Sequence, residues 1–148
     1  MMNKSILTLL ASVLVLFSSC DLLNCTQADV SLLRIEIYDA GGNKVMLPDT
    51  LTIRASGTET ILVNRDVNTQ EILLPMSYHA PVDTFILRYY SNYYSLEDTL
   101  FVEKTNDVFF ESPDCPTVMM HTIQSAFCTN VFLGSVEVVN EKVNFEEV

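Results

Sequence analysis

Four tyrosines near the middle of the sequence are the residues best suited to bind a ligand. Tyr89 and Tyr90 form one pair, Tyr93 and Tyr94 form another, and a Ser-Asn turn separates the pairs. Tyrosine offers a broad apolar ring with a polar hydroxyl, which suits stacking on a sugar ring or contact with a protein. The ordinary alternative is ring pairing across a hairpin, which contributes about 0.2 to 1 kcal/mol per pair to stability. The sequence leaves both interpretations open.

The other residues of the sequence form no recognisable catalytic motif. The two histidines, His79 and His121, do not stand in the spacing of a zinc protease. No Gly-x-Ser-x-Gly occurs, and four glycines are too few for a loop that cradles phosphate or a dinucleotide. A metal site from Cys115, His121 and Cys128 would have irregular spacing and lack a fourth ligand. We therefore expect a protein that is not an enzyme and uses no metal or cofactor.

The chain is acidic, with 19 Asp and Glu against 8 Lys and Arg and a formal charge of −11 at pH 7. Such a surface repels phosphate backbones and anionic lipid headgroups, so nucleic acid is not an expected partner. The acids are scattered along the chain and form no run. Their simplest role is to keep the protein soluble.

The elements that must position these residues are short strands. Apolar and polar residues alternate with a period of two in runs separated by turn residues. An all-β fold is predicted, an antiparallel β-sandwich of seven or eight strands, with an immunoglobulin-like form as one version and a small β-barrel as the alternative. Residues 119–127 are compatible with a helix but favour a strand. A hairpin turn is expected at 39–43, and strands are expected over 33–38, 51–55, 60–63, 85–90, 96–102, 108–110 and 136–139.

The first nineteen residues resemble a bacterial lipoprotein signal peptide. Lys4 carries the segment's only charge, and residues 6–17 form an apolar core too short to cross a bilayer. Two serines then precede Cys20, as in a lipobox, although Phe17 stands where leucine or valine is usual. Cleavage before Cys20 and acylation of that cysteine would anchor the chain to a membrane. A plain secretory peptide is the alternative.

This signal predicts the organisation and location of the protein. Residues 1–19 would be the cleaved signal peptide, 20–29 a lipidated tether and 30–148 a single β-sandwich domain, which is long enough for one core. The expected location is the cell envelope, with the outer membrane as the preferred site. The sequence does not choose between the periplasmic and the surface face.

Three cysteines remain once Cys20 is assigned to lipid. An exported compartment permits disulfides, and Cys25, Cys115 and Cys128 allow three pairings with one thiol left over. Cys25 and Cys115 lie in polar, turn-like stretches, whereas Cys128 follows an apolar segment where a buried thiol is common. This context favours a bridge from Cys25 to Cys115, which would close a loop of roughly 90 residues and contribute a few kcal/mol.

An aspartate followed by threonine and an apolar residue occurs three times, at Asp49, Asp83 and Asp98. The structural interpretation is that the aspartate bonds backbone amides at a turn and the threonine opens a strand. At Thr50 and Thr99 the tripeptide is Asp-Thr-Leu, which resembles the acceptor for O-glycosylation of exported proteins in Bacteroides-type bacteria. This resemblance implies O-glycosylation of both threonines.

Several short motifs follow one another along the chain: Leu74-Pro75-Met76, Asp83-Thr84-Phe85-Ile86-Leu87, Asp98-Thr99-Leu100, Ser112-Pro113-Asp114-Cys115 and Ser135-Val136-Glu137-Val138-Val139-Asn140. With the signal and the alternating strands, this order resembles a family of small lipoproteins from Bacteroidetes whose function is unknown. The resemblance covers about residues 25–140. It implies pairing of Cys25 with Cys115, gives Cys128 no counterpart, and supplies no substrate or catalytic residue.

Two classes of function remain. The first is a non-enzymatic envelope lipoprotein that contacts another protein, as an accessory subunit of a larger envelope complex. The second is a glycan-binding lipoprotein that uses the tyrosine hairpin. Both agree with the predicted fold, because sandwiches host many functions.

Overall fold

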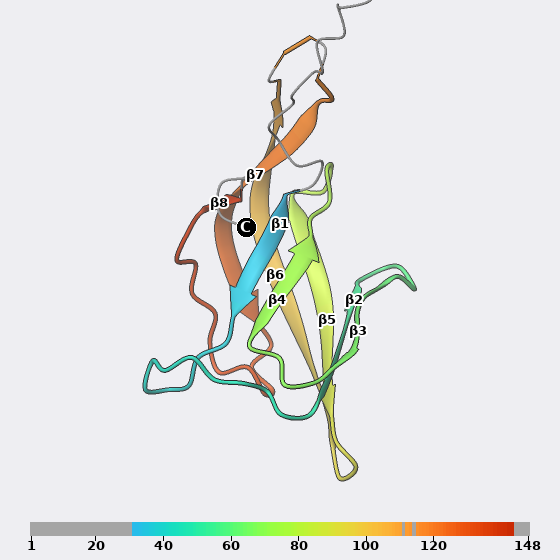
Figure 1. Cartoon of the computed structure of the whole chain (residues 1–148), viewed down its shortest axis with the longest axis vertical. Helices are drawn as coiled ribbons and strands as arrows, with labels where there is room; N and C mark the ends of the chain where they lie inside the picture. Colours follow the sequence, from blue (N-terminus) through green and yellow to red (C-terminus); the bar gives the residue numbers. More distant parts are fainter. Residues whose placement is uncertain (1–30, 111, 114, 144–148) are drawn as a thin grey trace, which may run out of the picture.

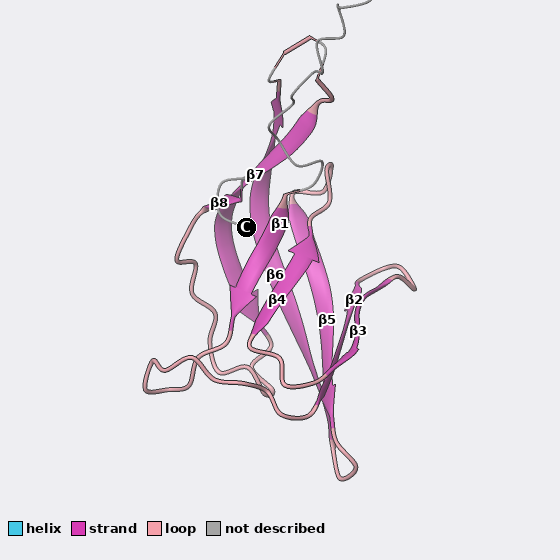
Figure 2. Ribbon diagram, viewed as in Figure 1, coloured by secondary structure: helices cyan, strands magenta, loops and turns pink. Residues whose placement is uncertain are grey.

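The computed structural model describes residues 31–110, 112–113 and 115–143. In these residues every regular element is a strand (Figure 2). None of them forms a helix long and apolar enough to span a membrane. The strands are β1 (Leu32–Glu36), β2 (Thr50–Ala55), β3 (Ile61–Asp66), β4 (Glu71–Pro75), β5 (Val82–Tyr90), β6 (Ser95–Phe109), β7 (Val118–Cys128) and β8 (Lys142–Val143).

The strands form two antiparallel sheets. β1 and β4 make a small sheet in which Leu33 lies opposite Leu74 and Ile35 opposite Ile72. The other six strands make a large sheet in the order β3-β2-β5-β6-β7-β8. The large sheet curls into half a barrel, and the small sheet packs over its inner face (Figure 1). This all-β, antiparallel, sandwich-like arrangement confirms the predicted fold class.

The core lies between the two sheets because alternate side chains of each strand point inward. In β5, Phe85 and Leu87 face the core and are each 2% exposed, whereas Arg88 and Tyr90 face the opposite side. Burying a large apolar side chain fully stabilises a fold by about 1.5 to 3 kcal/mol. We call the side of the large sheet that faces away from the core the outer face. The fully buried apolar side chains are those of Leu51, Ile53, Leu74, Leu87 and Val102.

The hairpin turn expected at residues 39–43 is confirmed. Tyr38 and Lys44 form a β-bridge across it, and the Asp39 carboxylate accepts hydrogen bonds from the amides of Gly41 and Asn43 at 2.8 and 2.9 Å. Gly42 has a φ of +79°, which favours glycine. The local chemistry of the turn therefore decides this reversal.

Other strand predictions need correction. The strand expected over 96–102 and residues 108 and 109 of the strand expected over 108–110 belong to one strand, β6, which ends before Phe110. Residues 119–127 belong to β7, as favoured. The prediction missed β4, whose sequence Glu-Ile-Leu-Leu-Pro does not alternate clearly. Residues 136–139 form no strand. Val136 and Val138 still pack against the core, so their alternation reflects burial without strand pairing.

Candidate functional site

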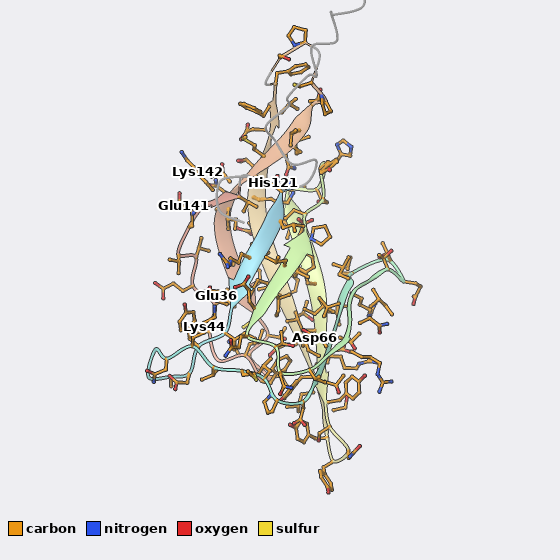
Figure 3. All side chains as sticks on the ribbon, in the orientation of Figure 1. Glu36, Lys44, Asp66, His121, Glu141 and Lys142 are labelled. Atoms are coloured by element: carbon orange, nitrogen blue, oxygen red, sulfur yellow. The ribbon has the colours of Figure 1, made fainter. Side chains whose placement is uncertain are left out.

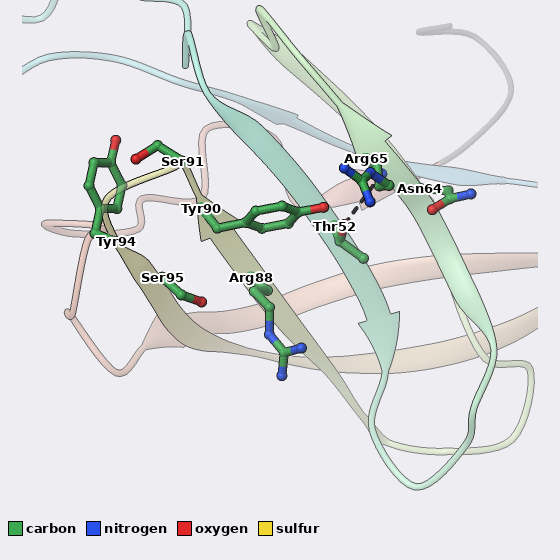
Figure 4. Close-up of a pocket in the computed structure, with 8 residues that line it drawn as sticks. All are labelled: Thr52, Asn64, Arg65, Arg88, Tyr90, Ser91, Tyr94 and Ser95. Carbon is green, nitrogen blue, oxygen red and sulfur yellow. Dashed lines mark hydrogen bonds between the residues drawn. The ribbon is translucent and has the colours of Figure 1, made fainter.

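A shallow groove lies on the outer face, where β2, β3 and the β5–β6 hairpin meet (Figure 4). Its volume is about 450 Å³, and a second hollow of about 200 Å³ shares Arg65, Tyr90 and Ser91 with it. Both are open to solvent, so they suit a ligand that lies along the surface. We call the larger hollow the outer groove; it is lined by Thr52, Asn64, Arg65, Arg88, Tyr90, Ser91, Tyr94 and Ser95.

Strand alternation and register bring the floor of the outer groove together. Arg88 and Tyr90 are two residues apart in β5 and therefore point to the same face. Thr52 of β2 lies directly opposite Arg88, so its side chain joins this face. Arg88 forms an exposed ion pair with Glu97 of β6, with 2.8 Å between Nη2 and Oε2. Exposed pairs of this kind contribute about 0 to 1 kcal/mol, so this one mainly orients the arginine.

Arg65 reaches the outer groove from an irregular part of the sheet. The pairing of β2 with β3 shifts register between Leu51 and Ile53, and such bulges re-aim side chains. Arg65 has a φ of +57°, a left-handed conformation that is uncommon for a residue with a side chain. Its amide donates a hydrogen bond to Thr52 Oγ1 at 3.3 Å. Its guanidinium carbon lies 5.7 Å from the centre of the Tyr90 ring, within cation–π range.

The structure separates the four predicted contact tyrosines. Tyr90 and Tyr94 line the outer groove. Tyr89 is only 8% exposed and stacks on Phe132, with 5.5 Å between ring centres, so it belongs to the core and cannot contact a ligand. Tyr93 is 94% exposed and lines neither hollow. The four tyrosines of this hairpin thus differ in role: Tyr89 is a core residue, Tyr90 and Tyr94 line the groove, and Tyr93 is exposed outside it. Alternation in β5 separates Tyr89 from Tyr90.

A hydrogen bond fixes Tyr94 in place. Its hydroxyl donates to Asp49 Oδ2, and the hydroxyl of Tyr89 lies 3.4 Å from the same oxygen. The bond to Asp49 is the main reason that the pKa of Tyr94 is raised above its usual value. Tyr94 is therefore a neutral wall of the outer groove, and two phenol groups cover the negative charge of Asp49.

The Asp-Thr tripeptides do not all open strands. Asp49 immediately precedes β2, but Asp83 and Asp98 lie inside β5 and β6 and are 8% and 0% exposed. The turn-opening interpretation is therefore wrong for Asp98. Thr50 and Thr99 are half-buried within strands, and their glycosylation stays a prediction.

The cysteine predictions fall largely outside the described residues, which do not include Cys20 or Cys25. Of the two described cysteines, Cys128 is free, and Cys115 has an interaction partner. The Cys128 thiol donates to Asn130 Oδ1 at 2.9 Å. Lipidation of Cys20 and pairing of Cys25 with Cys115 stay predictions.

The sequence reasoning missed a buried lysine at the end of the small sheet. The Lys104 side chain is 0% exposed, and its ammonium donates to the carbonyls of Ser77 and Ala80 at 2.6 and 2.9 Å and to Asn106 Oδ1 at 2.5 Å. Asp83 Oδ2 lies 3.6 Å from Nζ. Burial lowers the pKa of Lys104, and the Asp83 charge opposes that shift. The alternation of β6 could have revealed it, because Lys104 is two residues after Val102 and four after Leu100, and all three occupy inward positions of the strand.

His121 belongs to the same buried cluster. Its Nδ1 lies 2.8 Å from Asn106 Oδ1, which also accepts from Lys104, so Nδ1 carries the proton. Burial is the main cause that lowers the pKa of His121, and the Lys104 charge adds to it. The ring is therefore neutral near pH 7. None of these buried side chains lines either of the two hollows.

The surface around these sites carries ordinary ion pairs. Glu36 and Lys44 lie side by side at the edge of the small sheet, with 2.8 Å between Glu36 Oε1 and Lys44 Nζ (Figure 3). Arg34 pairs with Glu71 of β4 at 2.9 Å. Within the described residues, no three histidine, cysteine or acidic side chains are arranged to hold a metal ion.

The fold and the outer groove define a small antiparallel all-β domain with an open groove on its surface. The chain belongs to a family of unknown function (DUF6452), which its residues 50–148 match. The expected membership of a family of unknown function is thereby confirmed, and the match includes every residue of the outer groove. No curated protein and no solved structure was found to match the chain.

Proposed function

We propose that this chain is a non-enzymatic, lipid-anchored protein of the bacterial cell envelope that binds carbohydrate in the outer groove. The observation that carries the proposal is the position of Tyr90, whose ring forms part of an open groove among polar side chains (Figure 4). Sugars combine apolar ring faces with many hydroxyls, so their sites combine aromatic rings with hydrogen-bonding groups. Asn64, Ser91 and Ser95 supply such groups here.

The shape of the outer groove also favours a glycan over a compact small molecule. Drug-like ligands lie in cavities that bury most of their surface. The outer groove is shallow and continues past Tyr90 into the second hollow. A chain of sugar units laid across the sheet would contact Tyr90 and Tyr94 and leave one side in water.

Loss of the Tyr90 ring tests this proposal. We expect Tyr90→Ala to weaken binding of the best ligand on a glycan array by about tenfold, since one ring contact is worth about 1.4 kcal/mol. Tyr93→Ala is the matched control, because Tyr93 lies on the same hairpin but outside both hollows. Calorimetry measures the affinities, and thermal unfolding shows that both variants are folded. Equal binding by Tyr90→Ala and wild type, or no glycan bound by wild type, would refute carbohydrate binding in this groove.

A protein contact is the second candidate function, and the β6–β7 hairpin favours it. This hairpin projects beyond the rest of the large sheet (Figure 1). Val108 and Phe110 are 60% and 63% exposed along it. On the outer face, Phe127 is 50% exposed and stacks on Phe101, with 4.8 Å between ring centres. Exposed apolar side chains are typical of protein interfaces, and an envelope complex would supply the partner.

The anchor and the other modifications are read together from the intact mass of protein purified from its own membranes. We expect a chain that starts at Cys20 and carries two or three acyl chains, since stable anchoring needs two lipid signals. A shift of two hydrogens on reduction would report one disulfide, as the bridge from Cys25 to Cys115 requires, and added hexose would report glycosylation, as expected for Thr50 and Thr99. The Cys20→Ala variant should lose the lipid. An unlipidated wild-type chain would contradict the anchor.

A further inference from the structure

We infer that the outer groove binds an acidic carbohydrate, whose carboxylate or sulfate lies against the Arg65 guanidinium. This inference rests on the proposed function, because it specifies the ligand of the same groove. Its basis is the state of the two arginines that line the groove. They differ in whether an acid already neutralises them.

Arg88 is paired and Arg65 is not. Arg88 contacts Glu97, with 2.8 Å between Nη2 and Oε2. The Arg65 guanidinium takes part in no salt bridge among the described residues. The chain has 19 acidic side chains for 8 basic ones, so an arginine without a carboxylate beside an open groove stands out. Its charge is available to an anion from solution.

The placement of Arg65 leaves its donors usable. The guanidinium packs over the Tyr90 ring at 5.7 Å, and this contact still leaves N–H groups at its edge. Those groups form the planar fork that binds a carboxylate or sulfate through two hydrogen bonds. One anion bound there would lie beside the aromatic ring. An acidic sugar offers the matching pair of features, a charged group attached to a ring that stacks.

The backbone at Arg65 supports a role for the side chain. Its φ of +57° is a conformation that glycine adopts without strain and other residues adopt at a cost. Glycine would therefore suit the local fold better. The strained position instead carries a long cationic side chain that points into the groove (Figure 4).

Asp49, an acid beside this site, is hydrogen-bonded to two tyrosines. Asp49 lines the second hollow, together with Arg65 and Tyr90. Its Oδ2 accepts hydrogen bonds from the hydroxyls of Tyr94 and Tyr89. Two phenol hydroxyls thus hydrogen-bond the Asp49 carboxylate, and none of the described residues that line the outer groove is acidic.

A glycan array with matched acidic and neutral members tests the ligand class. Oligogalacturonate and its methyl ester share one backbone and differ in charge, and sulfated and unsulfated galactans form a second pair. We expect binding to acidic members only, and weaker binding as salt rises from 50 to 500 mM, about the range over which screening becomes strong. The uronate and sulfate arms show which anion is preferred. Binding to neutral members alone would overturn this inference and leave the proposed function standing, whereas no binding at all would overturn both.

Matched arginine variants test the residue. Arg65→Gln should weaken binding of the acidic glycan by about tenfold or more, because a hydrogen bond to a charged group is lost. Arg65→Lys should recover part of the loss, since it keeps the charge but not the fork. Arg54→Gln is the control, because Arg54 faces outward on β2 and does not line the groove. Wild-type affinity in a folded Arg65→Gln protein would refute the role of Arg65.

Discussion

Replacing Asp98 with alanine is expected to lower the free energy of unfolding by about 3 to 5 kcal/mol, because several hydrogen bonds to a buried charged group are lost and each is worth about 1.5 to 3 kcal/mol. The Asp98 carboxylate is 0% exposed and accepts hydrogen bonds from the Thr129 hydroxyl at 2.5 Å and from the amides of Val131, Phe132 and Leu133 at 2.8 to 3.1 Å. Alanine would leave all of these donors unpaired below the surface. Urea unfolding measures the loss.

The control for this variant lies one residue away. Glu97→Ala removes a carboxylate from the same strand, but Glu97 faces outward in an exposed ion pair with Arg88. Its expected cost is about 0 to 1 kcal/mol. An Asp98→Ala protein as stable as Glu97→Ala would show that the carboxylate does not hold residues 129–133 in place.

The same site predicts how stability depends on pH. Burial alone would raise the pKa of Asp98, but the Thr129 hydroxyl and the amides of residues 131–133 more than offset it and hold the pKa below its usual value. The stability from this group is fully present above the unfolded pKa of about 3.9 and is lost as pH falls through the lower folded pKa. The wild type should therefore lose stability below about pH 4, and Asp98→Asn should lose less over the same range.

The second large effect is expected at Lys104. Lys104→Met keeps most of the side-chain volume but removes a buried charge. It leaves Asp83 without its cationic partner and takes one donor from each of the carbonyls of Ser77 and Ala80. Removing one partner of a buried ion pair typically costs about 3 to 5 kcal/mol. Chemical denaturation measures the effect, and Lys142→Met, at an exposed position of β8, should change stability by at most about 0.5 kcal/mol.

A double variant shows whether the charge of Asp83 is the cause. Adding Asp83→Asn to Lys104→Met removes the unpaired carboxylate, so the two changes together should cost less than the sum of their separate effects. In the wild type the amide and the hydroxyl of Ser77 donate to different oxygens of Asp83. A side-chain amide at position 83 has only one acceptor oxygen, so recovery should be partial. Strict additivity would show that the two groups do not interact.

Local patterns were enough to predict most of the strands and two of the eight residues that line the outer groove, Tyr90 and Tyr94. Alternation in β5 separates buried Leu87 and Tyr89 from outward Arg88 and Tyr90, and the Ser-Asn turn marks the hairpin. Had the alternation been applied to each tyrosine separately, it would have identified Tyr89 as a core residue. The same alternation in β6 places the Lys104 side chain on the inward face.

The remaining features depend on contacts that are distant in sequence. Arg65 meets Tyr90 only because β2 lies between β3 and β5 and its pairing with β3 is bulged. Asp98 receives its donors from a loop more than 30 residues later. β4 finds its partner in β1 across two intervening strands. The two partners of each of these contacts are too far apart in sequence to occur in one short segment.

The pairing of β1 with β4 also determines when β1 can find its partner during synthesis of the chain. Leu32 pairs with Pro75, so the chain must build β2 and β3 before the partner of β1 is available. The chain is synthesised from its N-terminus, so β1 is made before β4. Until β4 follows, the backbone groups and apolar side chains of β1 lack the partners that they have in the folded protein. The small sheet can therefore pair once residue 75 has been made, whereas the large sheet that it covers stays incomplete until β5 to β8 follow.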